Sequence, residues 1–370
     1  MGHNQIKLLY DHQAFYLQRY GGISRYFTSL IGALIADNLA IVQMPFRWVQ
    51  NVHLMQSSYA NVRDPFSGMD FRGKARILDV RNKFLLQRAL RLKEFDVFQP
   101  THYDDYFLPH LGPKPFVITI HDLIAQRLPR YFSQSDRYES NKKRLTEHAA
   151  RIIAVSESTR KDLIALFGTS PERVTTIPLA AAPLRPSEGF PFAVPDRYLL
   201  YVGQRSAYKN FNRFSEAMAI VLASDPDLHL FCAGGGPLKD SETQAIRNFV
   251  QGGRVHWRSV DDAVLAALYR DAEAFVFPSL YEGFGIPILE SLQMGCPAIV
   301  SDRSSFPEVA GDAALYFDPD DVASIADTIQ RVIGDKALKT RLRDAGFRRE
   351  RDFSWQATAR KTLMLYQELR

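Results

Sequence analysis

The segment FPSLYEGFGIPILE, residues 277–290, continues an apolar run that begins at Ala274. A short apolar run bounded by turn residues indicates a buried parallel strand, here followed by a loop and a helix. Glu282 would lie on the loop and Glu290 in the first turns of the helix. Glycines let a backbone approach a ligand closely, and helix N-terminal amides suit anionic or hydroxyl-rich groups. We expect both carboxylates at a ligand site, with structural salt bridges as the alternative.

The same alternation of apolar runs and helical segments extends over the chain. Amphipathic segments such as 212–223 and 322–333 predict helices between the runs. Five prolines from Pro178 to Pro195 give a composition that neither helices nor central strands tolerate, so we expect a linker there. The runs expected to form strands are 6–10, 116–120, 151–155, 174–177, 198–202, 229–232, 274–277 and 298–300.

The length of the chain, 370 residues, exceeds the roughly 250 to 300 residues at which single cores stop growing. Together with the linker, it predicts an α/β protein of two doubly wound, Rossmann-like domains, residues 1–183 and 184–353. Ligands of open α/β sheets bind outside the carboxyl ends of the strands. We therefore expect the functional site in a central cleft between the two domains.

Composition and missing motifs exclude several classes of protein. A hydrophobic fraction of 46% and a charged fraction of 24% are typical of a soluble globular protein. Two cysteines, Cys232 and Cys296, exclude a disulfide framework, and we expect a cytoplasmic protein without a signal peptide or membrane span. Neither a P-loop nor a G-x-G-x-x-G fingerprint is present, so an ATPase and a nicotinamide dehydrogenase are unsupported.

The segment 72–93 holds eight basic residues and a single acid, Asp79. The basic residues alternate with apolar ones, which predicts a basic helix. Its face could be simply solvated, or it could attach the protein to anionic lipid headgroups. Nucleic acid is the least favoured partner, because no nucleic-acid-binding motif accompanies the charge.

Several segments together resemble the GT-B fold glycosyltransferases of family 4, retaining enzymes that use nucleotide sugars. The resemblance implies the GT-B arrangement of the two domains and a C-terminal helix, residues 354–370, that crosses back to the N-terminal domain. The opening residues 10–13 and 22–27 are most similar to bacterial members that build lipopolysaccharide or capsule glycans, often mannosyltransferases. The segments that carry the resemblance are residues 20–25, 121–122, 155–158, 203–205 with 209–210, the E-x7-E pair at 282 and 290, and 304–309.

The resemblance implies a diphosphate site. Arg205 and Lys209 are four residues apart, so both could point at one site, and two cations suit a diphosphate. Gly21 and Gly22 would bring backbone amides of the N-terminal domain against the same phosphates, since a Cβ would block that approach. The alternatives are exposed basic residues on a loop and an ordinary Gly-Gly turn.

The resemblance also implies contacts to the rest of the donor. Glu290 would bind the ribose hydroxyls and Glu282 the hydroxyls of the donor sugar. His121 would contact the transferred sugar, although it could instead cap the following helix. The remaining residues expected to bind the donor are Gly283, Phe284, Gly285 and Ile286 next to the carboxylates, and Ser259 and Val260 at the base.

Contacts to the acceptor are assigned to the N-terminal domain. Ser156 and Arg160 are expected to contact donor or acceptor, but Ser156 could equally be a helix N-cap. The further candidates, expected on loops of this domain, are His12, His102, Tyr103 and Asp104.

Metal and cofactor use are both expected to be absent. Two strings match the D-x-D metal motif of other glycosyltransferases, residues 225–227 and 318–320, but each has a central proline and reads as a turn. Arg205 and Lys209 would neutralise the leaving diphosphate instead. The nucleotide sugar, expected to be a GDP-sugar, is a co-substrate.

The expected function is retaining transfer of a hexose, mannose from GDP-mannose, to a hydroxyl of a growing, lipid-linked bacterial surface glycan. A retaining glycosidase also uses two carboxylates, but it has no use for the basic pair. Two alternatives stay open: a sugar-nucleotide 2-epimerase of the same fold, and a non-catalytic glycan- or lipid-binding relative. The expected location is the cytoplasm, with peripheral contact at the inner face of the membrane as a further hypothesis.

Overall fold

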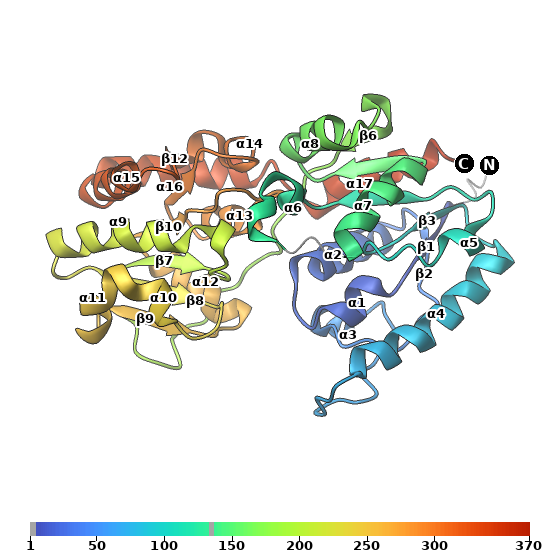
Figure 1. Cartoon of the computed structure of the whole chain (residues 1–370), viewed down its shortest axis with the longest axis horizontal. Coiled ribbons are helices and arrows are strands. Elements are labelled where there is room, and N and C mark those ends of the chain that lie inside the picture. Colours follow the sequence, from blue (N-terminus) through green and yellow to red (C-terminus); the bar gives the residue numbers. More distant parts are fainter. Residues whose placement is uncertain (1–4, 133–136) are drawn as a thin grey trace. The chain divides into compact units, whose positions relative to one another are not determined.

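The computed structural model describes residues 5–132 and 137–370, which divide into two compact units (Figure 1). Unit 1 comprises Met1–Gln126, Ser133–Leu179 and Ser354–Arg370. Unit 2 comprises Arg127–Phe132 and Ala180–Phe353. The division therefore falls after Leu179, earlier than the expected boundary at residue 183, and a short segment before α7 belongs to unit 2.

Unit 1 is built on short parallel strands in two three-stranded sheets, ordered β2-β1-β3 and β4-β5-β6. A single parallel bridge between Phe98 and Phe116 joins the two sheets at β3 and β4. Their inward side chains form one core, which includes Leu9, Phe98 and Ile152. The strands are β1 Lys7–Tyr10, β2 Ile41–Gln43, β3 Val97–Gln99, β4 Val117–Ile120, β5 Arg151–Ala154 and β6 Val174–Thr176.

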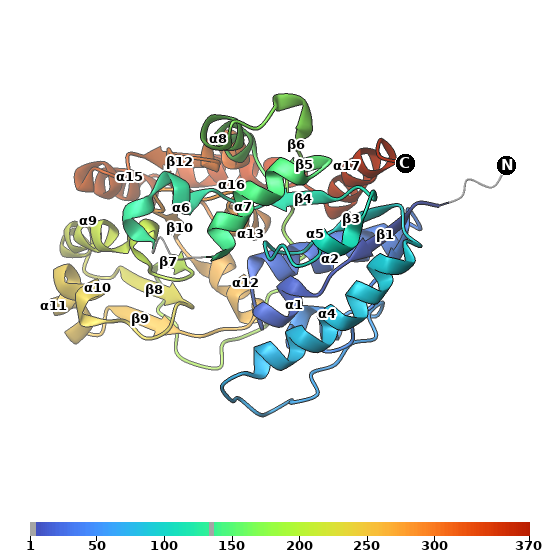
Figure 2. The same ribbon diagram turned by 45° about the vertical axis from the view of Figure 1, so that its right-hand side comes forward.

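Helices lie between these strands along the chain, and α17, from the C-terminal end of the chain, packs on α2 (Figures 1 and 2). Tyr366 of α17 contacts the sheet directly, because its hydroxyl donates to Gln99 Oε1 at 2.9 Å and lies 3.0 Å from the hydroxyl of Tyr10. The helices of unit 1 are α1 Gln13–Leu17, α2 Gly22–Ala36, α3 Val52–Gln56, α4 Lys74–Leu92, α5 Leu108–Leu111, α6 Ile124–Arg127 at the unit boundary, α7 Arg137–His148, α8 Glu157–Phe167 and α17 Trp355–Gln367.

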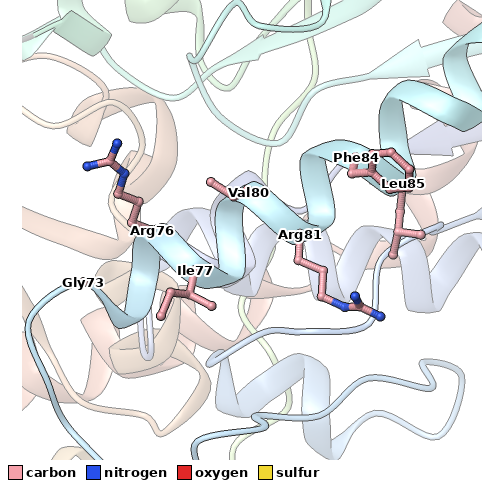
Figure 3. A pocket seen from close by; sticks show the side chains of 7 residues that line it. All are labelled: Gly73, Arg76, Ile77, Val80, Arg81, Phe84 and Leu85. Atoms are coloured by element: carbon pink, nitrogen blue, oxygen red, sulfur yellow. The ribbon is translucent and has the colours of Figure 1, made fainter.

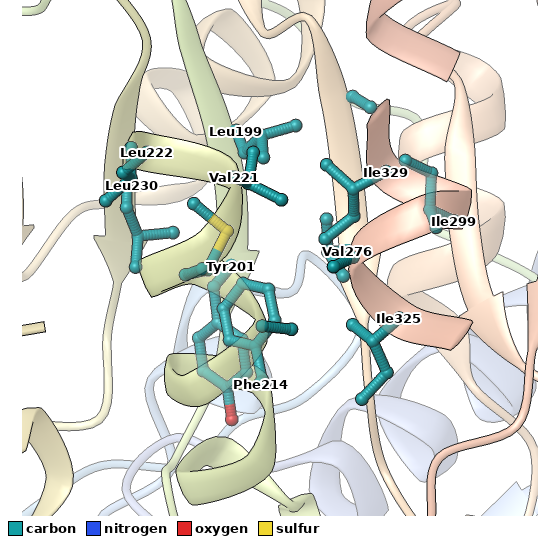
Figure 4. Packing of buried hydrophobic residues seen from close by; sticks show 14 of the residues in the cluster. Leu199, Tyr201, Phe214, Val221, Leu222, Leu230, Val276, Ile299, Ile325 and Ile329 are labelled. Atoms are coloured by element: carbon teal, nitrogen blue, oxygen red, sulfur yellow. The ribbon is translucent and has the colours of Figure 1, made fainter. Parts of the chain in front are cut away.

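Unit 2 contains one six-stranded parallel sheet, ordered β12-β11-β10-β7-β8-β9. Its central strands are continuous apolar runs because helices cover them. Figure 4 shows Leu199, Val276 and Ile299 of the strands packed with Val221 of α9 and Ile329 of α15. The strands are β7 Tyr198–Val202, β8 His229–Ala233, β9 Val255–Arg258, β10 Ala274–Phe277, β11 Ala298–Ser301 and β12 Ala314–Phe317. The helices are α9 Phe211–Ser224, α10 Asp240–Thr243, α11 Arg247–Gln251, α12 Asp262–Asp271, α13 Ile286–Gln293, α14 Phe306–Ala310, α15 Val322–Gly334 and α16 Lys336–Glu350.

The α/β fold class predicted from the sequence is confirmed, and each of the eight expected strands is present to within one residue at either end. Four strands were missed: β2, β3, β9 and β12. Two of them have only three residues, and β9 alternates polar and apolar side chains at a sheet edge. The fourth, β12, is a short apolar run that was overlooked. The expected cleft between the two domains stays a prediction.

Candidate active site

The carboxyl ends of the unit 2 strands gather the candidate donor-binding residues at one edge of the sheet. Arg205 follows β7, Glu282 follows β10, and Ser259 and Val260 follow β9. Because all six strands are parallel, these loops emerge at the same edge, which is where ligands of open α/β sheets bind. These residues of unit 2 therefore share one edge of a single sheet.

The loop between β10 and α13 has a conformation that depends on Gly285. This residue is the N-cap of α13 and has a φ of 106°, a left-handed value that favours glycine. A Cβ at this position would lie 3.2 Å from Ile288 Cδ1 and from Phe306 Cε1. The glycine thus allows the chain to turn from the loop carrying Glu282 into the helix carrying Glu290.

Two serines from the loop after β11 hold the backbone of the Glu282 loop. The amide of Glu282 donates to Ser304 Oγ at 3.0 Å, and Ser305 Oγ donates toward the carbonyls of Glu282 at 3.0 Å and Phe284 at 2.7 Å. Ser304 has a φ of 51°, which is uncommon for a residue other than glycine and marks local strain. Sequence reasoning assigned no role to these serines, because only their place in the 304–309 segment singled them out.

Lys209 and Glu282 meet directly in an ion pair between Nζ and Oε1. Both side chains are largely buried, with 17% and 13% of their surface exposed. The ammonium also lies 5.5 Å from the ring centroid of Phe277 and 5.2 Å from that of Tyr208, distances at which cation–π attraction operates. Two residues expected to touch different parts of the donor are therefore partners of each other here.

Arg205 contacts the glycine turn after β8 and the helix that follows it. Its side chain is only 1% exposed, and Nε donates to Glu242 Oε2 at 2.9 Å. The guanidinium NH groups donate to the carbonyls of Gly234, Gly235, Gly236 and Pro237 at 2.6–3.3 Å. Arg205 is thus not an exposed loop residue, because its buried side chain holds the glycine turn after β8; its role at a diphosphate stays a prediction.

The turn that Arg205 holds requires its glycines. Gly234, Gly235 and Gly236 all have φ values between 73° and 81°, and a Cβ on Gly235 would lie 2.5 Å from the carbonyl oxygen of Gly203. Because the chain turns so tightly, the carbonyls of residues 234–237 all point toward the guanidinium of Arg205. The glycines thus form a tight turn at the exit of β8, with an arginine at its centre.

Glu290 lies in the second turn of α13 and is 5% exposed. The hydroxyl of Tyr269 donates to its Oε2 at 3.4 Å. Gly283 and Phe284 lie on the loop, and Ile286 begins α13. Ser259 is exposed and Val260 is half-buried.

The candidate donor residues of unit 1 lie after β1 and β4. Gly21 is the N-cap of α2 and Gly22 its first residue; a Cβ on Gly21 would clash with the side chain of Gln18, whereas Gly22 has open space. His121 follows β4, and its amide donates to the hydroxyl of Tyr103 at 3.1 Å. Next to it, Asp122 Oδ1 accepts from the amide of Ile124, the first residue of α6, at 3.2 Å.

The imidazole of His121 is held neutral by its surroundings. The ring packs edge-on against Tyr26 with centroids 5.0 Å apart, and Nε2 is buried without a hydrogen-bond partner among the described residues. Burial lowers the pKa of His121 to about 3, because desolvation disfavours the charged form. His121 can therefore offer a neutral donor or acceptor, but not a cation.

The four acceptor candidates lie on loops of unit 1, as expected, and three of them are buried. His12 is the N-cap of α1 and fully buried, and its Nε2 lies 3.0 Å from Asp79 Oδ1 on α4. Lys83 links Asp79 at 2.9 Å to Asp104 at 2.8 Å. Tyr103 and Asp104 are 4% and 5% exposed, and His102 is half-buried beside Tyr103.

Ser156 and Arg160 make local structural contacts. The side chain of Ser156 accepts from the amide of Thr159 at 3.0 Å, which makes it the N-cap of α8, the alternative left open by the sequence. Arg160 lies 3.7 Å from Glu157 and donates to the carbonyl of Val174 at 3.4 Å. Neither contact assigns a ligand role to these residues.

Comparison with known proteins identifies the family. Residues 187–349 match the family described as "Glycosyl transferases group 1", and residues 20–181 match "Glycosyltransferase Family 4". The O-antigen chain mannosyltransferase B of Escherichia coli is 31% identical over 283 residues, which cover 72% of this chain and 74% of that protein. The chain is a family 4 glycosyltransferase.

Other relatives of this glycosyltransferase act in different glycan pathways. A MMP alpha-(1->4)-mannosyltransferase of Mycolicibacterium hassiacum is 29% identical over 61% of this chain and 56% of its own length. A glycogen synthase of Mycobacterium tuberculosis is 28% identical over 76% of this chain and 73% of its own length. Mannosyl transfer thus recurs among the relatives but is not common to all of them.

Solved structures confirm the GT-B fold of this glycosyltransferase. A sucrose-phosphate synthase of Thermosynechococcus elongatus matches with a TM-score of 0.74 at 22% identity, over 99% of each chain. WaaG, a glycosyltransferase involved in lipopolysaccharide biosynthesis, matches with a TM-score of 0.70 at 15% identity, over 98% of this chain and 99% of its own. At these identities the likeness concerns the fold alone.

The two Asp-Pro-Asp strings of the glycosyltransferase are paired with arginines. Asp225 accepts from Arg197 at 3.0 and 3.2 Å, and Asp318 accepts from Arg303 at 2.8 Å. Within residues 5–132 and 137–370, no group of three or more His, Cys, Asp or Glu side chains could hold a metal ion. The absence of a metal requirement stays a prediction.

The basic segment 72–93 forms α4, but its basic residues are not equivalent. Lys74 pairs with Asp64 at 2.7 Å, Lys83 is paired as described above, and the guanidinium of Arg81 lies 4.4 Å from the ring centroid of Trp48. The solvated face and the attachment to lipid headgroups both stay predictions for this helix, with Lys74 and Lys83 partly buried in ion pairs. Among the residues that the structure describes, no helix is long and apolar enough to cross a membrane.

Proposed function

We propose that this glycosyltransferase moves mannose from GDP-mannose to a hydroxyl of a lipid-linked bacterial surface glycan, with retention at the anomeric carbon. The observation that carries the proposal is the Lys209–Glu282 pair at the carboxyl edge of the unit 2 sheet. The mannosyl donor and the surface glycan are supported by the 31% identity to an O-antigen chain mannosyltransferase.

The Lys209–Glu282 pair provides a way to couple donor binding to assembly of the site. A diphosphate brings negative oxygens that compete with the Glu282 carboxylate for Lys209. Once Lys209 contacts phosphate, Glu282 is released to accept hydrogen bonds from the hydroxyls of the sugar. Each charge therefore has a partner both before and after binding, which avoids an uncompensated buried ion.

In the proposed reaction, the bond between the anomeric carbon and the diphosphate breaks as the acceptor hydroxyl approaches the same face. Lys209 stabilises the negative charge that develops on the leaving diphosphate, and a phosphate oxygen takes the proton of the acceptor hydroxyl. His121, neutral at physiological pH, contacts the sugar without adding positive charge beside the oxocarbenium-like carbon. Glu290 binds the ribose.

A donor panel tests the choice of nucleotide sugar. We expect GDP-mannose to raise the melting temperature more than the UDP-, ADP- and dTDP-sugars at equal concentration, because only the cognate donor satisfies both base and sugar contacts. Stabilisation by a UDP-sugar alone would overturn the proposed donor but not the enzyme class. Release of an epimerised nucleotide sugar without acceptor would instead support the 2-epimerase alternative, and no binding of any nucleoside diphosphate would support a non-catalytic role.

Transfer is expected to survive EDTA. The carboxylates of the Asp-Pro-Asp strings are held by Arg197 and Arg303, and Lys209 supplies the positive charge that a metal would otherwise bring to the diphosphate. The measurement is the initial rate with EDTA and after adding back Mg²⁺ or Mn²⁺. A rate abolished by EDTA and restored by either ion would show that the site needs a metal.

The pH dependence of stability tests the environment of His121. Its folded pKa of about 3 lies below the ordinary value near 6.5, so between these values the unfolded chain binds a proton that the folded chain does not. Stability from this group is fully present above pH 6.5 and falls as the pH decreases. We expect wild type to lose stability relative to His121→Gln in urea titrations as pH falls from 6.5 to 5. A difference independent of pH would contradict the buried, neutral imidazole.

A further inference from the structure

Helix α4 presents an apolar stripe on the side opposite to its buried face. Leu78, Asn82, Leu86 and Leu90, four residues apart, form the buried face of the helix in unit 1. Ile77, Val80 and Phe84 point elsewhere and are 44%, 61% and 70% exposed. Figure 3 shows these three side chains on successive turns of the helix, beside an open hollow of about 820 Å³.

In the segment before the helix, Met69 and Phe71 are also 56% and 38% exposed, and Phe71 packs edge-on against Phe66. Single exposed apolar side chains are normal, but a group of them on one side of a helix marks an interaction surface. We call Ile77, Val80 and Phe84 the α4 stripe.

Exposed arginines border the α4 stripe. Arg72, Arg76, Arg88 and Arg91 are exposed and make no ion pair or hydrogen bond with any residue in the described part of the chain. Asp79, the acid within the helix, is held by His12 and Lys83, whereas Asp70 and Glu94 at the two ends of the segment are exposed. The outer side of α4 therefore combines apolar side chains with an excess of positive charge.

We propose that the α4 stripe inserts into the interfacial region of an anionic lipid bilayer, with the bordering arginines on the headgroups. A helix with large apolar side chains and basic residues on its exposed side fits a negatively charged membrane surface. This inference rests on the proposed function insofar as a lipid-linked acceptor is confined to a bilayer, and it adds apolar insertion to electrostatic contact.

Charge favours a bilayer over a second copy of this chain as the occupant. In a two-fold dimer through the α4 stripe, the same surface patch faces itself, so the arginines of both copies would be brought together. An anionic bilayer instead offers a negative headgroup for each arginine and an apolar layer for Val80 and Phe84.

The inner side of α4 keeps the stripe in place. Lys83 and Asp79 tie the helix to His12 and Asp104 near the ends of β1 and β3. Asn82 accepts from the amides of Arg47 and Trp48 and donates to the carbonyl of Trp48. Substitutions on the exposed stripe leave all these contacts unchanged, so they are suited to a binding test.

Two substitutions test insertion directly. We expect Val80→Ser/Phe84→Ser to weaken co-sedimentation with vesicles of phosphatidylglycerol and phosphatidylcholine by about tenfold or more, because two apolar side chains no longer leave water. Met364→Ser is the matched control, since Met364 on α17 is 64% exposed. Arg88→Gln/Arg91→Gln should weaken binding at low salt and have little effect at high salt.

A fluorophore attached at a single residue reports whether that residue enters the bilayer. The two native cysteines are buried, and burial raises the pKa of both thiols, that of Cys232 to about 12, so they react poorly. A polarity-sensitive label on Val80→Cys should shift to the blue with anionic vesicles and not with phosphatidylcholine alone. The same label on Met364→Cys should show no shift.

Several results would overturn the inference. They are wild type remaining in the supernatant with anionic vesicles at low salt, Val80→Ser/Phe84→Ser sedimenting as wild type does, or a solution dimer that this variant dissociates. Transfer from GDP-mannose to a soluble mannoside, measured without vesicles, separates this inference from the proposed function: the serine variant should keep the wild-type rate. Vesicle binding without any transfer would sink the proposed function alone.

Discussion

Arg205→Ala is expected to lower the free energy of unfolding by about 3–5 kcal/mol, the cost of leaving one partner of a buried ion pair uncompensated. The substitution strands the carboxylate of Glu242 and the carbonyls of the turn at Gly234–Pro237. Urea denaturation measures the change. Arg341→Ala, at an exposed position of α16, should stay within about 0.5 kcal/mol of wild type. Unchanged stability with weaker GDP binding would show that Arg205 serves the diphosphate and not the turn.

Lys209→Ala is expected to lower kcat/KM for the donor by about tenfold to a hundredfold, the equivalent of about 1.5–3 kcal/mol for a charged hydrogen bond. The ammonium is the cation that the structure places beside Glu282 at the sheet edge. Lys336→Ala, at an exposed position on the first residue of α16, is the matched control. If Lys209→Ala kept the kcat/KM of wild type, the assignment of Lys209 to the donor site would be wrong.

The strands of unit 2 were predictable because parallel strands covered on both faces are continuous apolar runs. Residues 198–202 and 274–277 were placed without error as β7 and β10. The positions of Glu282 on the loop and Glu290 on the helix followed from the same pattern. The four missed strands are short or lie toward the edges of their sheets, where packing and not composition decides the conformation.

The contacts of Arg205 and Lys209 could not be derived from their spacing. Residues four apart lie on the same side only within an α-helix. Here the chain turns at Gly203, with a φ of 114°, and then forms the 3₁₀ turn Ala207–Lys209. Arg205 contacts the turn after β8 and Lys209 contacts Glu282 on the loop after β10, and their shared diphosphate site stays a prediction.

Partners from distant segments explain the other errors in the candidate site. His12 is 67 residues from Asp79 in the sequence, and Lys83 is 21 residues from Asp104. No local sequence pattern predicts such pairs. By contrast, the outward direction of Val80 and Phe84 follows from the four-residue spacing of Leu78, Leu86 and Leu90. Helical phase can thus be derived from the sequence, whereas long-range polar pairing cannot.

The central claim is that a donor diphosphate takes Lys209 from Glu282. Calorimetric titration of GDP into wild type, Lys209→Ala and Glu282→Gln tests it most directly. We predict that Lys209→Ala binds GDP at least about tenfold more weakly, while Glu282→Gln binds it as tightly as wild type or more tightly, because no carboxylate competes for the ammonium. Equal weakening in both variants, or unchanged affinity in Lys209→Ala, would contradict the claim.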